Sequence, residues 1–119
     1  MFIEREAGRG VDLGAVPAEV AISVVTVGEL WAGVLAATDT ATRAIRMRTL
    51  ADASDLVVVE VDAEVARAWA VLRVALRDAG RTLRTNDSWI AATALALDVP
   101  VVTQDSDFDG VPGLRVVRA

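Results

Sequence analysis

Residues 84–108 constrain the fold of this 119-residue chain more than any other stretch. They predict a helix that is capped by Thr85 or Asn86 and carried by residues 89–97, followed by a turn containing a proline. Val99, Val101 and Val102 then contribute to a short apolar strand within residues 99–103. Short strands this apolar are typical of a parallel sheet that helices cover on both faces. This stretch therefore predicts an α/β fold.

The rest of the chain continues the same alternation of strands and helices. Further strands are expected at residues 20–26, 56–61 and 114–118, and helices at residues 29–37, 41–53 and 62–79. Residues 1–10 resemble the end of a helix that runs into a glycine-rich loop, so no strand is expected there. The sequence thus predicts one domain, residues 1–119, with a mostly parallel sheet.

The residue types that the chain lacks exclude several kinds of functional site. The chain has no cysteine and no histidine, and all twelve of its basic residues are arginines. Disulfides, thiolate metal sites and histidine-based catalytic triads are therefore excluded. Any metal must be held by oxygen ligands, which favour Mg²⁺ or Mn²⁺. No signal peptide pattern and no apolar run of about 18 residues is present, so we expect a cytoplasmic protein with no membrane segment.

Four carboxylates are expected to meet at one edge of the sheet. Asp87 opens the central helix, Asp105 and Asp107 follow the strand after it, and Glu29 stands where an earlier strand gives way to a helix. Helix N-termini and strand C-termini share one edge of a parallel sheet, and ligands of open α/β sheets bind there. Carboxylates this close repel one another unless a cation neutralises them. Their joint position favours a divalent metal site.

Each of these acids also has a structural interpretation. Residues 26–29, Thr-Val-Gly-Glu, match a capping box, and the helix dipole favours an acid such as Asp87 in a first turn. The acids after residue 104 could form a solvated turn. They also resemble the opening of a calcium loop, but its closing glutamate is missing.

The arginines allow two interpretations. Arg43, Arg46 and Arg48 lie on one predicted helix, where they form either a solvated face or contacts to RNA phosphates or to a partner's acids, and Arg84 is a further candidate for such contacts. The formal charge of −5 argues mildly against a nucleic-acid partner. The objection weakens if several acids bind metal.

Three motifs resemble those of PIN-domain proteins, and more narrowly those of VapC-type ribonuclease toxins of bacterial type II toxin–antitoxin pairs. They are residues 23–30 (Ser-Val-Val-Thr-Val-Gly-Glu-Leu), 86–92 (Asn-Asp-Ser-Trp-Ile-Ala-Ala) and 102–108 (Val-Thr-Gln-Asp-Ser-Asp-Phe). The resemblance implies a PIN-like three-layer α/β/α fold with a mostly parallel central sheet. It also implies a Mg²⁺- or Mn²⁺-dependent endoribonuclease with an RNA substrate, a cognate VapB-type antitoxin and a tendency to form homodimers.

The resemblance assigns roles to individual residues. Glu29, Asp87 and Asp105 fall on the family's second, third and fourth acidic positions. Asp107 falls where an additional or alternative ligand could stand, and Thr103 on the hydroxyl that commonly accompanies the acids. Carboxylates in these positions would hold one or two metal ions, about 4 Å apart if two.

The family's first acidic residue has no clear counterpart. Family members open with an apolar strand that ends in this aspartate, whereas residues 1–6 here match the helix that follows it. Glu4 and Glu6 would lie too far into that helix to replace the aspartate. We therefore expect an N-terminally truncated PIN-like domain without its first strand, either because the start codon is assigned too late or because the chain is shortened.

Two alternatives follow from the sequence. A catalytically inactive PIN-like module could act through antitoxin or RNA binding, which the missing aspartate favours. A phosphoacceptor receiver domain also has acids at the same edge of a doubly wound sheet, but it requires a lysine after its last strand, and the chain has none.

Overall fold

The computed structural model describes residues 2–3 and 21–118. Within these residues, five strands form one parallel sheet in the order β3-β2-β1-β4-β5. The strands are β1 (Phe2–Ile3), β2 (Ala21–Ser23), β3 (Val57–Val59), β4 (Val101–Thr103) and β5 (Val116–Arg118). The predicted α/β class and the parallel sheet are confirmed.

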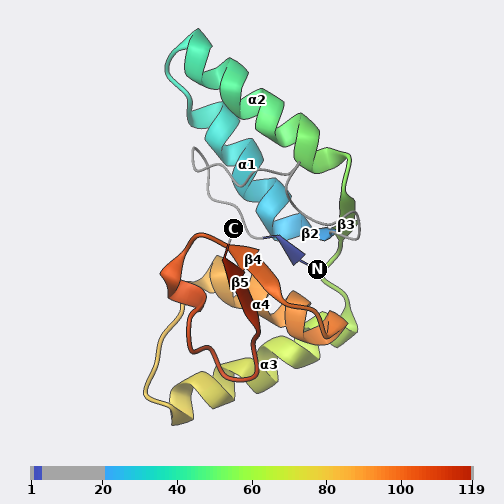
Figure 1. Ribbon diagram of the computed structural model, residues 1–119, viewed down its shortest axis with the longest axis vertical. Coiled ribbons are helices and arrows are strands. Elements are labelled where there is room, and N and C mark those ends of the chain that lie inside the picture. The colour runs from blue at the N-terminus through green and yellow to red at the C-terminus, as the bar shows by residue number, and fades with distance from the viewer. Residues whose placement is uncertain (1, 4–20, 119) are drawn as a thin grey trace.

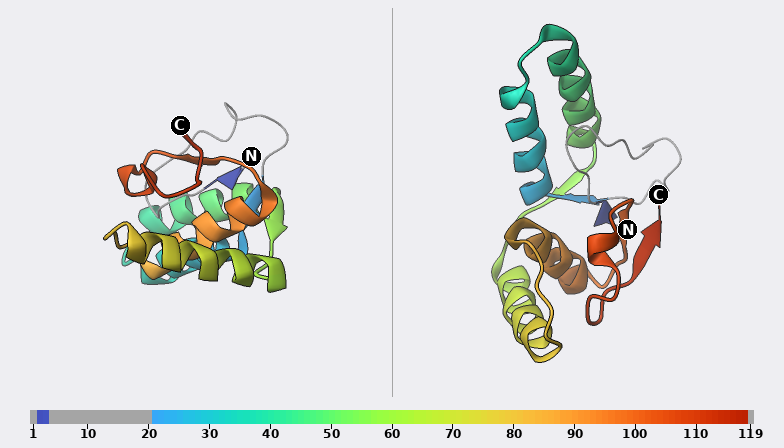
Figure 2. Two further views of the ribbon diagram at one scale, coloured as in Figure 1. Left: turned by 90° about the horizontal axis from the view of Figure 1, so that it is seen from below. Right: turned by 90° about the vertical axis from the view of Figure 1, so that its left-hand side faces the viewer.

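Four α-helices join the described strands (Figure 1). They are α1 (Val24–Ala36), α2 (Thr40–Ser54), α3 (Ala63–Asp78) and α4 (Thr85–Leu97), and a short 3₁₀ helix, η2 (Ser106–Phe108), follows β4. Helices α1 and α2 pack together as a hairpin that projects from the sheet, while α3 lies along α4 (Figures 1 and 2). None of the helices in the described part of the chain is long and apolar enough to cross a membrane.

The expectation that the first strand is absent is wrong. Phe2–Ile3 form β1, which pairs in parallel with β2 on one side and β4 on the other, so the middle of the sheet is occupied. A short apolar run has no periodicity that distinguishes strand from helix, which is why the sequence misled. Glu4 and Glu6, with the rest of the expected N-terminal helix and loop, lie outside the described residues.

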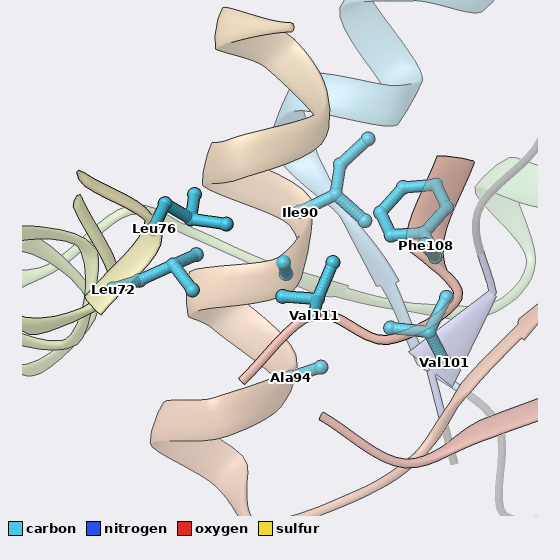
Figure 3. Packing of buried hydrophobic residues seen from close by; sticks show 8 residues of the cluster. Leu72, Leu76, Ile90, Ala94, Val101, Phe108 and Val111 are labelled. Atoms are coloured by element: carbon cyan, nitrogen blue, oxygen red, sulfur yellow. The ribbon is translucent and has the colours of Figure 1, made fainter. Parts of the chain in front are cut away.

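Two apolar clusters cover the two faces of the sheet. Neighbouring residues of a strand point to opposite faces, and Ala21 packs against one cluster while Ile22 belongs to the other. The cluster with Ile22 joins β2 to the α1–α2 hairpin. The larger cluster joins α3, α4, β4 and η2 (Figure 3), and its labelled members are Leu72, Leu76, Ile90, Ala94, Val101, Phe108 and Val111. The helices therefore form layers on both sides of the sheet.

Helix α1 begins earlier than the sequence pattern indicated. The Ser23 hydroxyl accepts a hydrogen bond from the Val25 amide at 3.1 Å and caps the helix at the end of β2. Thr26 is consequently a buried residue inside the first turn, and the capping box predicted for Thr26 and Glu29 is wrong. Glu29 lies in the second turn of the helix rather than at its start.

Both ends of α4 matter for the site. Arg84 occupies the N-cap position without a side-chain capping bond, so neither Thr85 nor Asn86 is the cap. Asp98 adopts a left-handed conformation, with φ of 53°, and follows the last helical residue, Leu97, where the predicted helical run of residues 89–97 also ends. The helix therefore returns the chain to the sheet with Asp87 in its first turn, at the edge where β4 ends.

Candidate metal centre

Three carboxylates converge where α4 begins and β4 ends. Asp87, Asp105 and Asp107 each place one carboxylate oxygen within 4.8 Å of the others. Asp87 and Asp105 are buried, with 3% and 8% of their surface exposed, whereas Asp107 is exposed. The structure thus brings together three of the four acids expected at this edge. Their role as metal ligands stays a prediction.

The loop after β4 is held in shape by its own side chains. The buried Thr103 hydroxyl accepts a hydrogen bond from the Asp105 amide at 2.9 Å. One oxygen of Asp105 in turn accepts from the Asp107 amide at 2.9 Å and caps η2. These bonds fix the backbone that carries both acids. Thr103, predicted as an accessory residue, accordingly positions Asp105.

The guanidinium of Arg84 lies among the three carboxylates. Its Nε is 3.2 Å from an oxygen of Asp87, and its Nη2 is 3.6 Å from Asp105 and 3.5 Å from Asp107. One exposed arginine therefore supplies positive charge to the whole cluster. The sequence indicated Arg84 only as a possible RNA or partner contact. Its spacing of three residues from Asp87 on a helix was the available signal.

The surroundings of Asp87 disfavour the ionised form of its carboxyl. Burial raises the pKa of the Asp87 carboxyl above its usual value, and the charges of Asp105 and Asp107 act in the same direction. Arg84 lowers that pKa but does not cancel the increase. A divalent cation would favour the ionised form, because it attracts all three carboxylates.

Glu29 lies close to this cluster but in a different position. It lines a hollow of about 300 Å³ together with Arg84, Thr85, Asn86 and Asp87. This volume is large enough for a cation with bound water, since one water occupies about 30 Å³ in the liquid. Among the described residues that line it, the charged acceptors are the carboxylates of Glu29 and Asp87, and such hard oxygen ligands fit Mg²⁺ or Mn²⁺. The donor set therefore fits the predicted metal.

Two of the three predicted contact arginines of α2 have structural partners. Arg43 donates to the Ala37 carbonyl at 3.1 Å, and Arg46 donates to the Gly33 carbonyl at 2.7 Å, which ties α2 to the end of α1. Arg48 is an exposed residue of the same helix. Contacts of these arginines with RNA or with a partner stay a prediction.

Comparison with known proteins defines the class. The model of the PIN domain family matches residues 3–114. The chain therefore belongs to the PIN domain family, and its PIN-like fold agrees with that assignment.

Individual relatives are similar over most of the chain. The chain is 46% identical to Ribonuclease VapC5 of Mycobacterium tuberculosis, over 99% of this chain and 90% of the relative. It is 42% identical to Ribonuclease VapC4 of the same organism, over 81% of this chain and 74% of the relative. The crystal structure of VapBC-5 from M. tuberculosis, a member of the VapBC family of toxin–antitoxin systems, matches with a TM-score of 0.88 and 41% identity, covering 99% of this chain and 97% of that one.

Proposed function

We propose that this protein is a Mg²⁺- or Mn²⁺-dependent endoribonuclease and the toxin of a type II toxin–antitoxin pair. The observation that carries the proposal is the convergence of Asp87, Asp105 and Asp107 within 4.8 Å, in a PIN domain that is 46% identical to a ribonuclease. Carboxylates grouped in this way at the edge of a parallel sheet suit a cation that acts on a phosphodiester.

The ligands are assigned from burial and position. Asp87 and Asp105 are the buried members and would hold the ion, with Asp107 and Glu29 as additional ligands around the neighbouring hollow. When bound, a divalent cation lowers the pKa of an attacking water and stabilises the charge that develops on the phosphate.

Two side chains have further roles in this proposal, one in positioning a ligand and one in contacting RNA. Thr103 keeps Asp105 oriented through the backbone bond described above. Arg84 reaches the carboxylates through an exposed side chain, so it can turn toward an RNA phosphate once a cation neutralises them.

The proposal includes partners. A relative whose structure belongs to a toxin–antitoxin system supports a VapB-type antitoxin, and RNA is the substrate that a ribonuclease requires. Exposed apolar residues of the projecting hairpin, Trp31 and Leu35 on α1, support an interface with an antitoxin or with a second copy in a homodimer. Such a toxin would act in the cytoplasm, where its RNA substrate is found.

The test is RNA cleavage with Mg²⁺ or Mn²⁺, compared with EDTA. Asp87→Asn should lower the rate by at least ~10²-fold, because it removes a charged ligand and disturbs the alignment of the reacting groups. Asp109→Asn is the matched control, since Asp109 belongs to the same loop but pairs with Arg118. Metal-independent cleavage, or equal rates for both variants, would contradict the proposal. RNA binding without cleavage by the unsubstituted protein would favour the inactive-module alternative.

A further inference from the structure

A second hollow, of about 370 Å³, lies between α3 and the segment that leads into α4. Three arginines, Arg73, Arg77 and Arg81, belong to its lining, and no aspartate or glutamate does so among the described residues. The chain as a whole carries a formal charge of −5, so this concentration of positive charge is local. A concave site with charge of one sign attracts a ligand of the opposite sign.

Two tryptophans support one of these arginines. The rings of Trp69 and Trp89 stack with their centroids 4.5 Å apart and their planes 3° from parallel. The guanidinium carbon of Arg73 is 4.8 Å from the Trp69 ring centroid. Because Trp89 covers one face of Trp69, Arg73 covers the other, where the cation–π interaction steadies it. In the described part of the chain Arg73 forms no ion pair, so its donors are available to a ligand.

The Trp69 ring is itself fixed to α4. Its Nε1 donates to the Ser88 hydroxyl at 3.0 Å, one residue along from Asp87. The stack of Trp89, Trp69 and Arg73 is therefore anchored to the same helical turn as the acid cluster.

The hollow adjoins the candidate metal centre. Thr85 lines both this hollow and the one that contains Glu29 and Asp87. Arg81 also reaches across to the acidic loop, where its Nη2 donates to the Asp107 carbonyl at 2.8 Å. An RNA strand with one phosphate at the candidate metal centre would therefore extend past Thr85 into the arginine-lined hollow.

We propose that the hollow around Arg73, Arg77 and Arg81 binds the nucleotides of a single-stranded RNA next to the phosphate that is cleaved. The inference rests on the proposed function and names the substrate class of that site. The arginines would bind backbone phosphates, and Arg73, backed by Trp69, would contact an unstacked base. A duplex keeps its bases paired and stacked, so it does not offer that contact.

The test measures binding without cleavage. Fluorescence anisotropy of a labelled single-stranded RNA is recorded in EDTA at several salt concentrations, for the full chain and for the double variant Arg73→Gln/Arg77→Gln. Removing one arginine that binds a phosphate should reduce the slope of log affinity against log salt by about 0.7, so the loss of Arg77 should make the slope of the double variant smaller by at least about 0.7. The loss of the Arg73 contact with a base should lower the affinity further. Arg67→Gln is the control, because Arg67 is an exposed arginine of the same helix outside this hollow. Melting temperatures establish that the variants are folded.

An unchanged slope in a folded double variant would overturn the proposal. An equal reduction of the slope in Arg67→Gln would also overturn it, because the reduction would then be a general effect of charge. Tighter binding of duplex RNA than of single-stranded RNA would overturn it as well. Binding in EDTA does not depend on cleavage. A failure here therefore leaves the proposed nuclease to its own test, and a failure of that test leaves this result standing.

Discussion

Replacing Arg84 should have opposite effects on stability with and without metal. Its guanidinium lies 3.2–3.6 Å from oxygens of Asp87, Asp105 and Asp107, so it stabilises the metal-free cluster and repels a cation that would bind there. Arg84→Gln keeps a side chain of similar length without the charge. We therefore expect the variant to be less stable without metal and to gain more from metal than the unsubstituted protein.

The loss of stability without metal depends on how exposed the Arg84 side chain is. The Arg84 side chain is 66% exposed, so solvent weakens its ion pairs, and their removal should cost about 1 kcal/mol rather than the ~3–5 kcal/mol of a buried pair. For a domain of this size that corresponds to a fall of about 4 °C in melting temperature.

The larger stabilisation by metal follows from the linkage between cation binding and folding. A cation at one hundred times its dissociation constant stabilises the folded state by about 2.7 kcal/mol. Tenfold tighter binding after removal of the competing guanidinium would add about 1.4 kcal/mol.

Thermal unfolding followed by circular dichroism, with EDTA and then with Mn²⁺, measures both effects. Arg115→Gln is a suitable control, because Arg115 is 62% exposed and pairs at 3.2 Å with Asp98, outside the cluster. Equal melting temperatures of Arg84→Gln and Arg115→Gln in both conditions would mean that Arg84 neither stabilises the metal-free cluster nor competes with a cation.

Two further predictions concern single residues. Burial raises the pKa of Asp87, so its ionised form costs stability above that pKa and the cost disappears as the pH falls through it. Asp87→Asn should therefore raise the melting temperature of the metal-free protein at neutral pH, and the difference from the unsubstituted protein should shrink in acid; a difference that grows in acid would reverse the assignment. Phe108 is fully buried beside Asp107, and Phe108→Ala should cost about 3–5 kcal/mol in urea unfolding. A cost below about 1 kcal/mol would mean that the loop packs differently.

The sequence predicted most of the fold because its elements follow local rules. The helix expected at residues 62–79 is α3, where Asp62 caps the start by accepting from the Val65 amide and Gly80, with φ of 65°, follows the end. The juxtaposition of Asp87 with Asp105 was predictable for a different reason. In a parallel sheet, topology alone places helix starts and strand ends at one edge.

Other features depend on tertiary contacts that no local rule contains. The sequence pattern assigned Phe2–Ile3 to a helix, and only pairing with β2 and β4 makes it a strand. Arg84 looked like an exposed contact residue, and its place among the acids requires the loop after β4 to fold against α4. The arginine-lined hollow joins α3 to residues near α4, so Arg73 and Thr85 are neighbours only in the folded chain.

Anomalous diffraction from a crystal soaked in Mn²⁺ would reveal a divalent cation held by the three carboxylates. We predict an anomalous peak for an ion that lies about 2.1 Å from carboxylate oxygens of Asp87 and Asp105, with the Arg84 guanidinium displaced from its present contacts. A map with no peak at this cluster under saturating Mn²⁺, and with Arg84 still bridging the three acids, would show that the carboxylates are not a metal site.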